Sequence, residues 1–165
     1  MYMTIADFAK EWEKEAERTE RVLNVLTDES LRQRVVSGRR TLGGLAWHLV
    51  TSAGYMSALG LDFEGVAQGG SAPESAGEIA GEYRRISAAV LQAVKTQWSD
   101  AHLDGTVTIM GEEWRNGDSM HFTLMHQAHH RGQMTVLMRQ AGLRAPDVYG
   151  PTYEYWIDQG MKPLE

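Results

Sequence analysis

The sequence predicts an all-α fold, a four-helix bundle, and three observations support this. At 165 residues the chain is long enough for one domain with its own core. Hydrophobic residues make up 42% and charged residues 23%, the balance of a globular protein rather than a disordered one. Four long segments repeat apolar residues at steps of three and four, and β-strand signals are few. We therefore expect residues 1–165 to form a single four-helix-bundle domain.

The first two predicted helices cover residues 4–26 and about 41–59. At the start of the first, Thr4 and Asp7 have the spacing of a capping box, in which side-chain oxygens satisfy free backbone N–H groups. The second helix carries a stripe of leucine and methionine residues. His48 falls on that stripe, so it should point toward the interior of the bundle.

The segment 31–40, between these helices, is rich in arginine and contains Arg32, Arg34, Arg39 and Arg40. It could form a basic binding patch, but we interpret it as a solvated connector because the chain carries a net charge of −6. That acidity also argues against a nucleic-acid partner. No apolar run approaches the ~20 residues that span a membrane, and no signal peptide is recognisable. A cytoplasmic protein is therefore expected.

The second half of the chain predicts two further helices and an interruption between them. A loop rich in glycine over 60–74 leads into a helix at about 75–98. Residues 106–115 alternate as a short strand does and contain a glycine, so we expect a short hairpin or loop there. The last long helix should run over about 118–140, with Gly142 as its stop signal. An aromatic C-terminal tail follows, and we expect it to pack across the bundle.

The histidines are the residues most suggestive of chemistry. His126 and His130 are four apart on the last helix and share one face, whereas His129 points elsewhere. With His48 they could form a metal site in the bundle core, or serve as hydrogen-bonded core residues. A zinc-protease motif is disfavoured because Gln127 occupies the position of the required glutamate.

Several segments together resemble the DinB/YfiT-like superfamily of metal-dependent enzymes. They are the histidine-rich run 126–134 (HQAHHRGQM), the following 137–142 (LMRQAG), the upstream 45–50 (LAWHLV) and the closing 145–150 (APDVYG). The resemblance covers nearly the whole chain. It implies a bundle of up-down-down-up type, in which the matching residues His48, His126 and His130 bind a divalent metal.

The resemblance also implies a chemistry. Three neutral histidines leave coordination positions open, with zinc or nickel as the leading metals and iron, cobalt or manganese as alternatives. Relatives include transferases that use low-molecular-weight thiols, so the expected activity is transfer of such a thiol, held as a metal-bound thiolate, to an electrophilic small molecule. The chain has no cysteine, so the thiol would come from the cosubstrate. The alternatives are a hydrolase that uses metal-bound water and a non-catalytic metal-binding bundle.

Five further residues are candidates for the pocket or for contacts that support the metal ligands. Gln133 lies one turn beyond the second histidine of the pair and could orient a ligand, or simply pack. Arg131 could bind a carboxylate of the cosubstrate, or form a surface ion pair. Tyr149, Tyr153 and Trp156 could wall the pocket, or belong to a packed tail. A homodimer is a further expectation, since helical bundles commonly pair through exposed faces.

Overall fold

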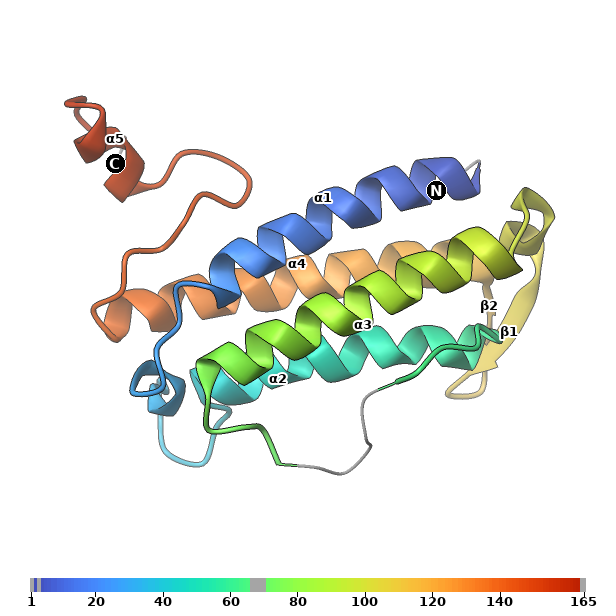
Figure 1. Ribbon diagram of the computed structural model, residues 1–165, viewed down its shortest axis with the longest axis horizontal. Helices are drawn as coiled ribbons and strands as arrows, with labels where there is room; N and C mark the ends of the chain where they lie inside the picture. Colours follow the sequence, from blue (N-terminus) through green and yellow to red (C-terminus); the bar gives the residue numbers. More distant parts are fainter. Residues whose placement is uncertain (1, 3, 66–70, 164–165) are drawn as a thin grey trace.

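Four long helices lie along one another and form the body of the molecule (Figure 1). The computed structural model describes residue 2 and residues 4–65 and 71–163. The four helices are α1 (Ile5–Leu23), α2 (Leu42–Ala53), α3 (Ala76–Gln97) and α4 (Asn116–Gln140). In Figure 1, α1 and α4 run in one direction and α2 and α3 in the other, so the topology is up-down-down-up as expected. Both α1 and α2 pack mainly against α3 and α4. Within the described ranges, no helix combines the length and apolar character needed to cross a membrane.

The predicted helix starts are formed by side-chain caps. Thr4 Oγ1 accepts from the backbone N–H of Asp7 at 3.0 Å, and the Thr4 N–H donates back to the Asp7 carboxylate at 3.2 Å. Ser75 caps α3 by accepting from the N–H of Glu78 at 3.4 Å. These contacts satisfy N–H groups that have no partner inside the helix.

Two helices end earlier than their apolar patterns indicate. α1 stops at Leu23, because residues 27–30 form their own turn through reciprocal hydrogen bonds between Thr27 and Ser30. α2 stops at Ala53 and continues as the 3-10 helix η2 (Gly54–Leu59). Apolar spacing alone does not distinguish the two helix types, because a short 3-10 segment also brings every third residue to one side.

The expected hairpin is present between α3 and α4. Strands β1 (Thr106–Ile109) and β2 (Glu112–Arg115) pair antiparallel and are joined by Met110 and Gly111, which both have positive φ. α4 begins at Asn116, slightly before the predicted start. The Asn116 backbone N–H donates to the Gly105 carbonyl at 2.8 Å, which ties the start of the helix to the base of the hairpin.

Gly142 ends α4 as predicted. Its φ of 78° lies in the left-handed region, its N–H donates to the Arg139 carbonyl, and the Leu143 N–H donates to the Met138 carbonyl. These two hydrogen bonds form a Schellman motif.

The prediction that the aromatic tail packs across the bundle is confirmed only for its first part, where Val148 and Tyr149 contact the bundle, and is wrong for α5. No residue of α5 (Tyr153–Asp158) is buried, and Figure 1 shows this short helix standing away from the four long ones. Exposed ion pairs of Glu154 with Arg139 and of Asp158 with Arg144 hold it near the end of α4. Within α5, the aromatic rings of Tyr155 and Trp156 contact each other edge-on.

Candidate metal centre

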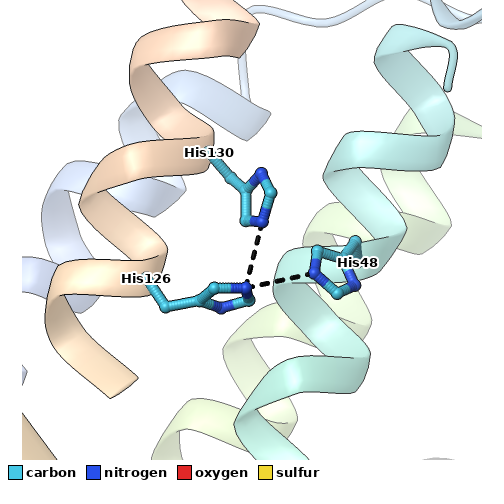
Figure 2. A group of neighbouring side chains, drawn as sticks. All are labelled: His48, His126 and His130. Carbon is cyan, nitrogen blue, oxygen red and sulfur yellow. Dashed lines mark hydrogen bonds between the residues drawn. The ribbon is translucent and has the colours of Figure 1, made fainter. Parts of the chain in front are cut away.

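Helices α2 and α4 bring His48, His126 and His130 together in the space between them (Figure 2). The Nε2 atom of His126 lies 3.3 Å from that of His48 and 3.0 Å from that of His130. Two nitrogens that bind one zinc ion at ~2.0–2.1 Å are ~2.9 Å apart at a right angle and ~3.4 Å apart in a tetrahedron. Both of these separations fall in this interval, and the ligand atoms of all three residues lie within 4.8 Å of one another, so the cluster could hold a divalent ion of that size.

The surroundings favour the neutral form of these histidines. Burial lowers the pKa of His48 to about 4, and the positive charge of Arg40 adds to the effect. Burial also lowers the pKa of His126 and of His130, again with a contribution from Arg40. The three imidazoles are therefore uncharged at neutral pH, and the neutral ring is the form that binds a metal.

Gln133 orients one of the three rings. Its side-chain oxygen lies 2.7 Å from Nδ1 of His130 and can only accept, so Nδ1 carries the proton and the lone pair of Nε2 faces the other two histidines. The Gln133 amide nitrogen lies 3.1 Å from Nε2 of His129. His129 itself is exposed and stays outside the cluster, as its helical position predicts.

Gln127 lies between His126 and His130 in the sequence of α4 and supports the site from the core side. This buried side chain points into the core, where its Nε2 donates to the Leu49 carbonyl at 3.3 Å and its oxygen accepts from the Tyr83 hydroxyl at 2.9 Å and the Thr19 hydroxyl at 3.3 Å. It thus joins α4 to the other three helices. Its contact on α2, Leu49, is the residue next to His48. Sequence reasoning missed this role, although polar residues four apart on an inward face could have indicated it.

Arg131 lies in the core between α1 and α4: the ion pair suggested from the sequence is present but buried rather than at the surface, and the side chain faces α1 rather than a cosubstrate pocket. Its side chain is 0% exposed and forms an ion pair with Glu15. It also donates to the Glu15 carbonyl at 3.0 Å and to the Thr19 hydroxyl at 2.7 Å. A helical position next to a metal ligand points about 100° away from it, which places Arg131 against α1 rather than in the site.

Glu15 remains ionised inside this network. Burial alone would raise its pKa, but the hydrogen bond from Tyr149 and the charge of Arg131 outweigh that effect, so the pKa is lowered. The Tyr149 hydroxyl donates to the carboxylate at 2.5 Å. Tyr149 therefore closes the ion pair at the surface and does not reach the histidines.

Two cavities reach the histidine cluster from different sides. The larger, about 620 Å³, has His48 and His126 on its wall, and the smaller, about 410 Å³, has His130 and Gln133. Tyr153 and Trp156, which were candidates for the pocket wall, line neither. The aromatic walls of the larger cavity come from η2, the hairpin and the first half of α4, through Tyr55, Trp114 and Phe122. The smaller cavity lies between the arginine-rich connector and the second half of α4 and includes Arg39 and Arg40.

Comparison with known proteins agrees with the fold and with the motifs. The DinB family profile matches residues 1–161. The chain is 45% identical over 163 residues to the uncharacterized protein YrdA of Bacillus subtilis (strain 168), covering 98% of each. A crystal structure of a DinB-like protein from Bacillus cereus ATCC 10987 superposes with a TM-score of 0.86 at 45% identity, covering 90% of this chain and 100% of that one. A second DinB-like structure, YjoA of Bacillus subtilis, has a TM-score of 0.67 at 12% identity over 89% and 96% of the chains, and supports the fold alone. The chain belongs to the DinB family.

Proposed function

We propose that this protein is a divalent-metal-dependent enzyme that transfers a low-molecular-weight thiol to an electrophilic small molecule. The observation that carries the proposal is the convergence of His48, His126 and His130, of which the first two lie on the wall of a cavity of about 620 Å³. His48, His126 and His130 would hold the ion, with zinc or nickel as the leading candidates and iron, cobalt or manganese as alternatives. When bound, such an ion supplies Lewis acidity that lowers the pKa of a thiol.

The larger cavity is suited to bind the electrophile. Its volume falls in the range of small-molecule pockets, and its walls are mainly apolar. The ring of Phe122 stacks on that of His126 at 5.9 Å between centroids and contacts Trp114 edge-on, so an apolar group bound there lies beside the histidines. The buried Ser119 hydroxyl also lines this cavity and has no hydrogen-bond partner in the described part of the chain, so it is available to a polar group of the substrate.

The proposed reaction is a substitution at carbon. The thiol loses its proton to solvent, and its sulfur forms a bond to the electrophilic carbon. The bond from that carbon to the leaving group breaks, and the leaving group departs with the electron pair. The apolar walls exclude water from this carbon and hold it close to the sulfur, which favours transfer over hydrolysis.

Hydrolysis is the alternative reaction. It would call for a general base near the histidines, and among the described residues no aspartate or glutamate lines either cavity. Thiol transfer makes no such demand on the chain, because a thiol is far more acidic than water. The arrangement therefore supports the transferase more strongly than the hydrolase.

Metal content is the first test. Untagged wild-type protein should contain about one divalent metal per chain by elemental analysis, and His48→Ala and His126→Ala should lose it. His121→Ala is the matched control: this histidine lies on the same helix, contacts the ring of Tyr2 and is outside the cluster, so it should retain the metal.

Turnover is the second test. Metal-loaded protein with chlorodinitrobenzene should release chloride only when a thiol is added, and His126→Ala should be inactive. Product formation without thiol would instead assign a hydrolase. Metal binding without turnover across a panel of thiols and electrophiles would leave a non-catalytic metal-binding bundle. Absence of metal from wild-type protein, even after incubation with zinc or nickel, would refute the proposal.

A further inference from the structure

We propose that the smaller cavity is the anion subsite of the thiol cosubstrate, in which Arg39 and Arg40 bind its carboxylate groups. The inference rests on the proposed function for the identity of the ligand. It assigns a role to the arginine-rich connector, which the sequence analysis interpreted as a solvated link. It also places carboxylate recognition, first considered for Arg131, at two other residues.

The position of the cavity is the first argument. It measures about 410 Å³ and opens between the connector and α4, with His130 and Gln133 on one wall and both arginines on another. Val35, Leu45, Val136 and Leu137 complete the lining with apolar surface. A ligand in this space therefore meets the two cationic arginines, apolar side chains and one histidine of the cluster, His130.

The electrostatic state of the two arginines is the second argument. Many arginines of this acidic chain form ion pairs with carboxylates, namely Arg18, Arg84, Arg85, Arg115, Arg131, Arg139 and Arg144. Neither Arg39 nor Arg40 forms an ion pair with any carboxylate in the described ranges. Both guanidinium-bearing residues line the same cavity as His130, which places them on the side of the cluster where a ligand would enter from this cavity.

The chemistry of guanidinium groups is the third argument. Arginine presents paired N–H donors that match the two oxygens of a carboxylate, and this pairing is stronger when part of the contact is shielded from water. Two adjacent arginines suit a ligand with two carboxylates. Such a ligand would direct its sulfur toward His130 and leave the larger cavity, on the side of His48 and His126, for the electrophile. The two substrates would then approach the histidines from different cavities and be bound at the same time.

Calorimetry on metal-free protein at low ionic strength tests the subsite without reference to activity. Mercaptosuccinate carries two carboxylates, and thioglycerol is a thiol of similar size with none. We expect mercaptosuccinate to bind the wild type and thioglycerol to show no measurable binding. R39Q/R40Q should weaken mercaptosuccinate binding by about tenfold or more, because two charge-assisted contacts are lost. Added salt should weaken the wild-type binding as well.

Arg34→Gln is the matched control, because Arg34 belongs to the same connector but lines a different depression on the surface. It should bind mercaptosuccinate as the wild type does. Equal affinity in R39Q/R40Q and wild type would overturn the proposal, and so would an equal loss in Arg34→Gln. Tighter binding of inorganic phosphate than of mercaptosuccinate would overturn the assignment to carboxylates. Thermal melting of each variant shows that it is folded, as expected for exposed side chains.

Kinetics with metal-loaded protein distinguishes failure of the subsite from failure of the proposed function. If both hold, R39Q/R40Q raises KM for mercaptosuccinate and leaves KM for thioglycerol unchanged. If the subsite alone is wrong, thiol transfer persists and the double variant changes neither KM. If the proposed function is wrong, neither thiol supports turnover, while mercaptosuccinate still binds the metal-free protein; a carboxylate site would then remain, without a cosubstrate role.

Discussion

Replacing Arg131 with methionine tests whether the buried ion pair between α1 and α4 holds the bundle together. Methionine fills a similar volume but removes the charge and all the donors. The substitution leaves the Glu15 carboxylate, the Glu15 carbonyl and the Thr19 hydroxyl without the contacts that Arg131 makes to them. All of these groups lie in the interior, where water does not readily replace a lost partner.

The expected loss can be worked out from these contacts. Removing one partner of a buried ion pair costs ~3–5 kcal/mol. Arg18 still pairs with the Glu15 carboxylate and Tyr149 still donates to it, so we expect the lower end of this range. A chain of 165 residues has an unfolding entropy of roughly 0.35 kcal/mol/K, so a loss of ~3 kcal/mol lowers Tm by roughly 9 °C.

Calorimetry and urea unfolding of Arg131→Met measure this loss directly. The double variant Glu15→Leu/Arg131→Met removes both charges, and we expect it to be more stable than Arg131→Met alone, because no charge is left buried without its partner. The metal content of Arg131→Met should equal that of the wild type, since Arg131 is outside the histidine cluster. An Arg131→Met protein within about 1 kcal/mol of wild type would refute the reasoning, because surface substitutions commonly have effects that small.

Four further predictions follow from the structure. Gln127→Glu should lower the free energy of unfolding in urea by ~1–3 kcal/mol, because the buried hydrogen bond that joins α4 to the Leu49 carbonyl of α2 is lost; unchanged stability would contradict this. Gln133→Leu should weaken metal binding ~10–100-fold in a chelator competition, with Gln133→Glu, which keeps the acceptor, as the control. Because the folded-state pKa of Glu15 is lowered, its contribution is complete above its ordinary pKa of 4.5 and disappears as the pH falls through the lower folded value; Tm of wild type and of Glu15→Gln should therefore converge in acid, and a constant difference would disprove the link. Tyr153 and Ile157 are 63% and 49% exposed on α5, so we expect a homodimer that buries them; sedimentation should give a monomer for Tyr153→Ser/Ile157→Ser, and an unchanged dimer would place the interface elsewhere.

Local signals in the sequence predicted much of the fold. The caps at Thr4 and Ser75 and the Schellman glycine Gly142 act over a few residues, so their spacing is sufficient to locate helix ends. The four-residue spacing of His126 and His130 likewise determines that both side chains share a face.

The features that the sequence did not predict depend on contacts between distant segments. Arg131 is buried only because Glu15, 116 residues earlier in the chain, lies opposite it on α1. Hydrophobic tail residues normally indicate packing, yet no residue of α5 is buried, and its polar residues pair with Arg139 and Arg144 at the end of α4. Arg39 and Arg40 are exposed, as the interpretation as a solvated connector expects, but charge patterning counts residues and does not reveal that they also line a cavity.

Metal binding at the histidine cluster would also cross-link the chain, which has no cysteine and therefore no disulfide to do so. His48 and His126 are 78 residues apart in sequence, and α3 and the hairpin lie between them. An ion coordinated by both would act as a reversible cross-link across that loop. In the chain-entropy treatment used for disulfides, closing a loop of this length removes roughly 4.5 kcal/mol of conformational freedom from the unfolded chain. The same ion would thus hold α2 and α4, the helices that carry its ligands, against each other. Release of the ion would loosen α2 from α4.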